Sequence, residues 1–119
     1  MPMLPEDVVD EYAASLIEPD EDERRAILAG IWTDDCEVVL LEGRLQGREE
    51  VNAHITRIRQ EFGNATPRLT GAFVAHHGFL RFDWQILDPA GDIVARGVNF
   101  GEQAEDGRLR RVVVFREGD

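Results

Sequence analysis

The chain has 119 residues, 43% hydrophobic and 31% charged, which fits one compact domain and neither a disordered tail nor a membrane protein. The formal net charge is −11 and all 13 cations are arginine, which disfavours nucleic-acid or membrane partners and excludes lysine Schiff-base chemistry. The single cysteine, Cys36, excludes an internal disulfide and a cysteine zinc cluster, so we expect a reducing cytoplasm as the compartment.

Apolar residues recur at intervals of three and four in two segments near the start of the chain, which predicts two helices. The first covers residues 6–18 and ends at Pro19. Asp20 has the position of an N-cap for the second, which leads into a β-branched, apolar strand over residues 36–41. The predicted buried faces are Val8, Val9, Tyr12 and Leu16 in the first helix, and Ile27, Leu28, Ile31 and Trp32 in the second.

A third helix is predicted over residues 48–62, after a short polar segment at residues 44–46. Its apolar stripe consists of Val51, His54, Ile55, Ile58 and Phe62. The hydrophobic period then changes to two, which is typical of β-strands. Four strands are predicted over residues 68–77, 79–88, 92–103 and 108–116, with glycine-containing turns between them.

This order of elements predicts an α+β fold with a single domain over residues 1–119. Three N-terminal helices should pack on a curved, mostly antiparallel sheet and enclose an apolar cone. Strict alternation places Leu109, Arg111, Val113 and Phe115 on the inner face of the last strand. Because the opposite face of that strand is also partly apolar, we expect a homodimer through the outer face of the sheet.

The order and its landmarks resemble the nuclear transport factor 2-like superfamily, which has a cystatin-like α+β cone, and within it the SnoaL-like proteins, small polyketide cyclases and their relatives. The resemblance covers the chain from about Val8 to Phe115. Its landmarks are Tyr12, the segment from Ile31 to Asp35, Gly47, the hairpin from Phe79 to Phe100, and the segment from Asp106 to Leu109. The superfamily hosts isomerases, cyclases, dehydratases and non-catalytic binders, so the resemblance implies the fold more than the chemistry.

Ketosteroid isomerase, a member of that superfamily, offers a residue-by-residue comparison. Its phenolic oxyanion donor falls on Tyr12 of this sequence. Its aspartate base falls on Leu40, and its second oxyanion donor, a neutral carboxylic acid, falls on Val98. One of three catalytic positions is kept, which argues against steroid isomerisation by that mechanism because Leu40 cannot carry a proton.

Two residues are candidates for catalysis. A phenol facing an apolar cone can donate a hydrogen bond to a developing enolate oxygen, which points to Tyr12; a helix-packing tyrosine is the alternative. Imidazole is suited to proton transfer near neutral pH, which points to His54; a core histidine is the alternative. Arg111 is expected on the inner face, where Glu42, Glu102 or a substrate carboxylate could pair with it; a structural ion pair or a place at the rim of the cone is the alternative to a role in binding.

The pocket is expected to need no cofactor, and the adjacent His76 and His77 are not expected to bind a metal, because neighbours on a strand point to opposite faces. The ligand-binding residues predicted beside Tyr12 and His54 are Trp32, Val38, Leu40, Ile58, Phe62, Phe73, Trp84, Val98, Phe100, Arg111, Val113 and Phe115.

Three hypotheses remain open. The first is a cofactor-independent isomerase, cyclase or dehydratase that acts on a small, largely hydrophobic carbonyl compound. The second is a non-catalytic carrier of such a molecule, since Leu40 and Val98 leave little acid–base equipment. The third is a dimeric interaction protein whose cone is filled by its own aromatic side chains. The all-arginine cation set is typical of a high-GC bacterial genome.

Overall fold

The computed structural model describes residues 2–119, with residues 71 and 72 described by their backbone alone. The helices are α1 (Pro5–Ile17), α2 (Glu21–Ile31) and α3 (Arg48–Phe62). The strands are β1 (Trp32–Leu40), β2 (Gly43–Gln46), β3 (Thr66–His76), β4 (Phe79–Leu87), β5 (Ile93–Gln103) and β6 (Leu109–Arg116). They form one sheet in the order β2-β1-β6-β5-β4-β3, in which only the β1–β6 pair is parallel.

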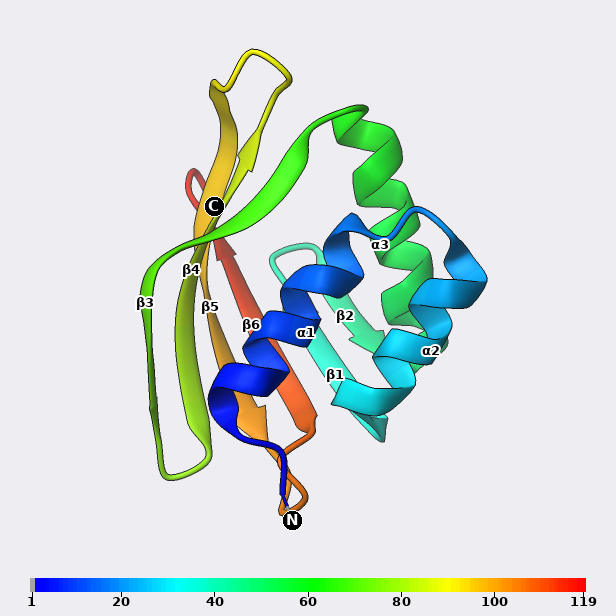
Figure 1. Ribbon diagram of the computed structural model, residues 1–119, viewed down its shortest axis with the longest axis vertical. Helices are drawn as coiled ribbons and strands as arrows, with labels where there is room; N and C mark the ends of the chain where they lie inside the picture. Colours follow the sequence, from blue (N-terminus) through cyan, green and yellow to red (C-terminus); the bar gives the residue numbers. More distant parts are fainter. Residues whose placement is uncertain (1) are drawn as a thin grey trace.

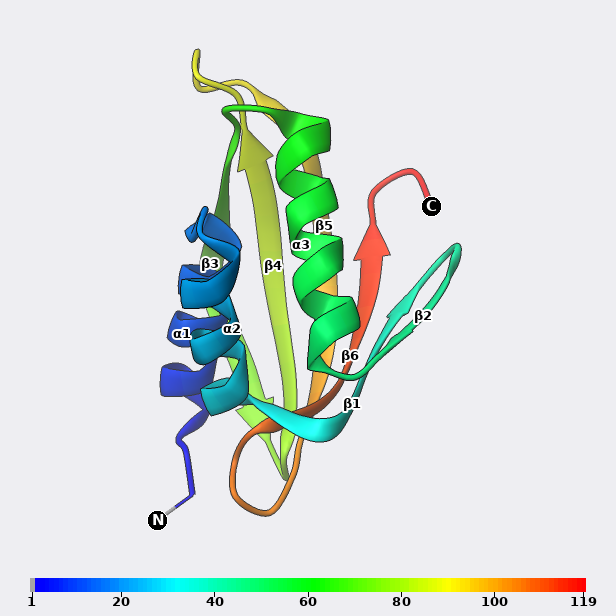
Figure 2. The ribbon, with the colours of Figure 1, turned by 90° about the vertical axis from the view of Figure 1, so that its right-hand side faces the viewer.

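All three helices cover the same face of this curved sheet, as Figures 1 and 2 show from two directions. The predicted α+β class and the antiparallel meander of the last four strands are therefore confirmed. The buried apolar residues lie between these two layers, and the largest fully buried one is Trp32. No helix within residues 2–119 is long and apolar enough to cross a membrane.

The helix boundaries follow their local chemistry. The side chain of Asp20 accepts hydrogen bonds from the backbone amides of Asp22 and Glu23, both 2.9 Å long, so it caps α2 as predicted. Helix α3 spans the predicted residues, and it begins after Gly47, whose φ of +83° favours glycine.

A buried arginine joins α2 to α3. Arg24 is 1% exposed, and its Nε donates to Oδ1 of Asn52 over 2.5 Å. Its other nitrogens donate to the Glu18 carbonyl, the Asn52 carbonyl and the Thr56 hydroxyl. Asn52, also 1% exposed, donates in turn to the Glu21 carbonyl. We call these residues the Arg24 cluster; its donors end on neutral protein acceptors.

Two local predictions need correction near the first strand. Strand β1 begins at Trp32, directly after α2, rather than at residue 36. The short polar segment at residues 44–46, to which no strand was assigned, belongs to strand β2, which pairs with β1 through partners such as Val38 and Leu45. Polar side chains are compatible with a strand here because β2 lies at the sheet edge, where much of its surface faces solvent.

Strand β5 presents its small residues, not its large ones, to the helices. Ala95, Asn99 and Gly101 are buried, whereas Phe100 is 44% exposed. The cause lies on the neighbouring strand β4, where Leu80, Phe82, Trp84 and Ile86 face the helices. Across the two strands, Leu80 pairs with Gly101, Phe82 with Asn99, Trp84 with Gly97 and Ile86 with Ala95. Large side chains on β4 thus cover small ones on β5, and the expectation that Val98 and Phe100 face inward is wrong.

The last strand contains a bulge that reverses its faces. Gln103 pairs with Leu109 and Glu102 with Arg111, so Arg110 is an extra residue in β6. After this bulge Val112, Val114 and Arg116 lie on the helix side. Arg111, Val113 and Phe115 lie on the outer side, contrary to the prediction from strict alternation. Arg111 there forms ion pairs with Glu37 (2.9 Å) and Glu102 (3.2 Å), so its structural interpretation is confirmed.

Candidate functional site

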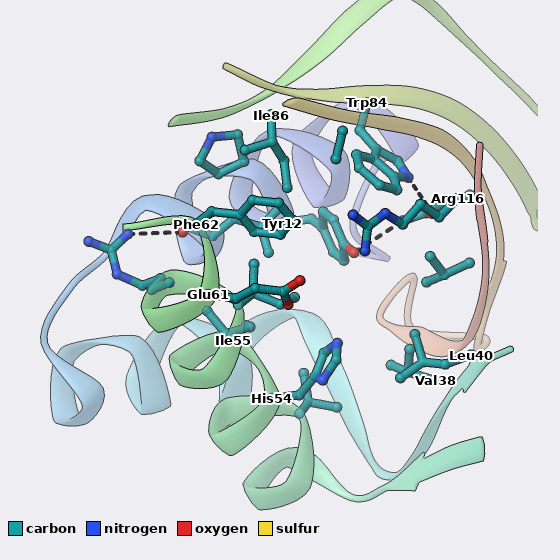
Figure 3. A pocket seen from close by; sticks show the side chains of 18 of the residues that line it. Tyr12, Val38, Leu40, His54, Ile55, Glu61, Phe62, Trp84, Ile86 and Arg116 are labelled. Carbon is teal, nitrogen blue, oxygen red and sulfur yellow. Dashed lines mark hydrogen bonds between the residues drawn. The ribbon is translucent and has the colours of Figure 1, made fainter. Parts of the chain in front are cut away.

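A cavity of about 210 Å³ lies between α1, α3 and the inner face of the sheet. Its walls are mostly apolar, and Figure 3 shows side chains from both layers reaching into it. The exposed members of its lining are Leu41, Glu42, Glu61, Arg68, Arg116 and Asp119, so the cavity opens beside the ends of β1, α3 and β6 and the start of β3.

Half of the predicted site residues line this cavity. Those brought together are Tyr12, Val38, Leu40, His54, Ile58, Phe62 and Trp84. Those placed elsewhere are Trp32, Phe73, Val98, Phe100, Arg111, Val113 and Phe115. Trp32 and Phe73 belong to the packed core and its edge, while the other five are on β5 and β6 and face outward for the reasons given above.

A chain of hydrogen bonds fixes the orientation of Tyr12. The indole Nε1 of Trp84 donates to Oδ1 of Asn99 over 2.8 Å, and Nδ2 of Asn99 donates to the hydroxyl oxygen of Tyr12 over 3.2 Å. An indole nitrogen can only donate, so the oxygen of the amide must face Trp84 and its NH₂ group must face Tyr12. We call these three residues the Tyr12 triad.

The triad leaves one proton without a protein acceptor. The oxygen of Tyr12 is occupied as an acceptor, and its O–H has no acceptor among the described residues. Burial raises the pKa of Tyr12 to about 12, although the bond from Asn99 lowers it, so the phenol is neutral at physiological pH. Tyr12 lines the cavity and can therefore donate its proton to a hydrogen-bond acceptor placed there.

Helix α3 supplies two titratable groups of the cavity, His54 and Glu61. The imidazole of His54 has no hydrogen-bond partner among residues 2–119, and it reaches into the cavity in Figure 3. Burial, aided by the positive charge of Arg57, lowers its pKa, so the ring is neutral at physiological pH and can accept a proton. Glu61 lies two turns further along the same helix and also lines the cavity.

The opposite wall carries no such group. Val38 and Leu40 of β1 line the cavity there, and the side chains beside them on β6 and β2 are Val114 and Leu45. A base acting in the cavity must therefore come from α3 or from the opening. Within the described part of the chain, no three His, Cys, Asp or Glu side chains are arranged to hold a metal ion.

Several polar residues of the cavity were not predicted, among them Asn99, Glu61 and Arg116. The sequence contains a signal for Asn99, because Ala95, Gly97 and Gly101 alternate with it and small residues are needed opposite the large ones of β4. Strand alternation could not predict Arg116, because the bulge at Arg110 exchanges the inner and outer faces of β6 for every residue that follows it. Glu61 lies at the edge of the apolar stripe of α3, next to Phe62.

Comparison with solved structures places this arrangement among known proteins. A protein of the SnoaL-like family from Agrobacterium tumefaciens str. C58, provisionally described as an isomerase, is 30% identical over 93% of this chain and 95% of its own, with a TM-score of 0.87. A SnoaL-like protein from Jannaschia sp. CCS1, provisionally described as a polyketide cyclase, has a TM-score of 0.71 at 13% identity and covers 98% of this chain and 91% of its own.

A third structure, from Sinorhizobium meliloti and also provisionally described as a polyketide cyclase, is 16% identical with a TM-score of 0.70 and covers 94% of this chain and 95% of its own. Because the Jannaschia and Sinorhizobium proteins are only 13% and 16% identical to this chain, their similarity shows a shared fold and nothing more. No protein-family model matches the chain, and no curated protein sequence matches it.

Proposed function

Because the chain belongs to the SnoaL-like family of the nuclear transport factor 2-like superfamily, we propose that it is a cofactor-independent enzyme that transfers protons on a small, largely hydrophobic carbonyl compound. Isomerisation, cyclisation and dehydration of such a compound share one first step, the removal of a proton next to the carbonyl. The observation that carries the proposal is the unused proton of Tyr12, directed toward the cavity by Asn99 and Trp84.

The roles of the two candidate residues follow from the charge that develops in this step. When the proton leaves carbon, negative charge gathers on the carbonyl oxygen, and a donor already in place stabilises it without reorganising. Tyr12 supplies that donor. His54 is the group on the facing helix that can accept the proton, because its lowered pKa keeps the imidazole neutral near pH 7.

The size of the cavity limits the substrate to about one ring. A cavity of about 150 Å³ can bind benzene, whereas sites for drug-sized ligands start at about 300 Å³. The 210 Å³ found here lies between these values. The volume favours a monocyclic or short-chain carbonyl compound over a steroid or a multi-ring polyketide.

The hypothesis of a non-catalytic carrier also has a supporting observation. Leu40 stands at the position to which the resemblance assigns the aspartate base of ketosteroid isomerase, so the cavity has one neutral imidazole and no carboxylate deep inside it. A carrier would use the proton of Tyr12 to hold a carbonyl oxygen and would leave the compound unchanged.

Exchange of hydrogen for deuterium next to a carbonyl distinguishes the enzyme from the carrier. The exchange needs only the removal of the proton next to the carbonyl, which is the first step shared by the three candidate reactions. We suggest incubating the protein in D₂O with monocyclic ketones such as cyclohexanone and 2-cyclohexenone, and following the α-proton signals by ¹H NMR. Catalysed exchange is expected for the wild type. Tyr12→Phe should slow it by about 100-fold and His54→Gln by at least as much.

His76→Gln serves as the matched control, because His76 lies exposed at the β3–β4 turn away from the cavity. It should leave the exchange rate unchanged. Full exchange activity in both Tyr12→Phe and His54→Gln would show that these residues do not carry the reaction. A ketone that binds but exchanges no faster than in buffer would favour the carrier.

We also propose a homodimer through the outer face of the sheet. Phe100 and Phe115 pack edge to face on β5 and β6, with ring centroids 5.8 Å apart, yet they are 44% and 50% exposed. The ion-paired Arg111 and Glu102 lie beside them, so the face carries both charges and can complement a second copy of itself. Phe115→Arg should give a monomer in sedimentation equilibrium, whereas the wild type sediments as a dimer. Ile17→Arg is the control, because Ile17 is 52% exposed at the end of α1, in the helix layer on the other side of the sheet.

For the location, we propose the cytoplasm, where the buried thiol of Cys36 stays reduced.

A further inference from the structure

Three arginines line the cavity, and two of them have protein acceptors. Arg59 donates to the carbonyl of Leu16, and Arg68 donates twice to the side chain of Gln85. The guanidinium of Arg116 has no hydrogen-bond acceptor among the described residues. Its neighbour is the ring of Phe62, whose centroid lies 5.5 Å from Cζ of Arg116.

The position of Arg116 results from the bulge in β6. The extra residue at Arg110 turns Val112, Val114 and Arg116 toward the helices, so the strand ends with a cation on its inner face. Contact with Phe62 of α3 then places the guanidinium across the opening of the cavity, on the same side as the Tyr12 triad in Figure 3.

An unpaired cation is unusual for this chain. Eight of the 13 arginines have a carboxylate within 4.0 Å among the described residues, and there are 24 acidic residues to pair with. The carboxylates nearest to the opening do not neutralise Arg116. Glu42, Glu61 and Asp119 line the same cavity, and none of them forms an ion pair with it. Asp119 accepts a hydrogen bond from the backbone N–H of Arg116 instead, over 3.0 Å.

We propose that the ligand is a small oxo acid, whose single carboxylate binds Arg116 at the opening while its carbonyl oxygen receives the proton of Tyr12. A guanidinium presents paired N–H donors that match the two oxygens of a carboxylate. The inference rests on the proposed function, because it uses the same cavity and the same donor. The acidic lining residues disfavour a second negative group, so the substrate class is a monocarboxylate with one ring or a short chain.

A matched pair of probes tests the carboxylate. We suggest 3-oxocyclohexane-1-carboxylate and its neutral carboxamide, which have nearly the same shape and the same ketone, titrated by isothermal calorimetry at low ionic strength. The wild type should bind the acid at least 10-fold more tightly than the amide. Arg116→Gln should remove this preference while leaving the affinity for the amide unchanged, and Arg116→Lys should restore part of it.

Two further variants separate this inference from the proposed function. Arg57→Gln removes an exposed arginine of α3 that has no ion pair within residues 2–119, and it should leave the preference for the acid intact. Tyr12→Phe should weaken both probes by a similar factor. Equal affinity of the wild type for the two probes, or a preference that survives Arg116→Gln, would overturn the role of Arg116 and leave the ketone site standing. If the wild type binds neither the acid nor the amide, both the carboxylate site at Arg116 and the ketone site at Tyr12 are overturned.

Discussion

The Arg24 cluster joins α2 to α3, and the Tyr12 triad joins α1 to the sheet; both are polar networks inside the fold, yet they differ in one respect. The guanidinium of Arg24 donates to two carbonyls, an amide oxygen and a hydroxyl, all from the protein. The triad ends on a phenol whose proton meets no acceptor in the described structure. A closed network fixes helices in place, while an open one beside a cavity can hold a ligand.

The largest effect is expected from opening the closed network. Arg24→Ala leaves Asn52 and two buried carbonyls without their donors, and it should lower the free energy of unfolding by about 4 kcal/mol. For a chain of this length the melting temperature should fall by roughly 15 °C. Arg57→Ala, on the exposed side of α3, should stay within about 0.5 kcal/mol of the wild type in the same thermal scan. A loss as small as that for Arg24→Ala would contradict its structural role.

The next effect comes from the space that the triad requires. A Cβ on Gly97 would lie 2.6 Å from Cζ2 of Trp84 and even closer to the carbonyl oxygen of Phe115. Gly97→Ala should therefore displace Trp84 and cost about 3 kcal/mol in urea unfolding. Gly101→Ala is the matched control, because its Cβ would meet Leu80 at an ordinary 3.5 Å. Equal stability of the two variants would show that β4 and β5 are not packed as described.

Tyr12 allows a clean titration because the chain has one tyrosine. Its pKa is raised from 10.0 to about 12, so the folded protein holds this proton more tightly than the unfolded chain. The resulting stability is complete below pH 10 and is lost as the pH rises from 10 to 12, a loss of between about 2 and 3 kcal/mol. The phenolate absorbance of the native protein should report the raised pKa, and Tyr12→Phe should lack this loss. A phenol that titrates near pH 10 would place Tyr12 in solvent.

A smaller effect is expected when the direction of the Tyr12 proton is released. Asn99→Leu removes the donor that occupies the phenol oxygen, so the hydroxyl can rotate and the pKa of Tyr12 should rise further. Ketone binding should weaken by about 10-fold, measured by calorimetry with cyclohexanone, or about 1.4 kcal/mol. Unchanged binding would mean that Asn99 does not position the hydroxyl.

The smallest effect concerns His54. Its folded pKa lies below the ordinary 6.5, so the neutral form contributes stability that is present above pH 6.5 and is lost as the pH falls through the folded pKa. The ring proton signals of His54 in ¹H NMR should titrate below pH 6.5 in the native protein and at the ordinary value in urea. A native pKa at or above 6.5 would mean that the ring is not buried against the cavity.

The sequence predicted most of the fold and part of the site, and the difference has a physical cause. Helical periodicity brought Tyr12, His54 and Phe62 to the cavity, because a helix keeps its faces over its whole length. Strand alternation failed on β6, where one extra residue at Arg110 exchanges the two faces. It failed on β5 because large residues such as Phe100 suggested a core face, whereas the neighbouring Trp84 requires a glycine beside it.

The most direct test of the account is the carbonyl ¹³C resonance of labelled cyclohexanone bound to the protein. If the proton of Tyr12 is donated to a ligand in the cavity, this resonance should move downfield on binding to the wild type and lose that shift in Tyr12→Phe. A bound ketone with the same carbonyl shift in both proteins would contradict the claim that Tyr12 faces the ligand.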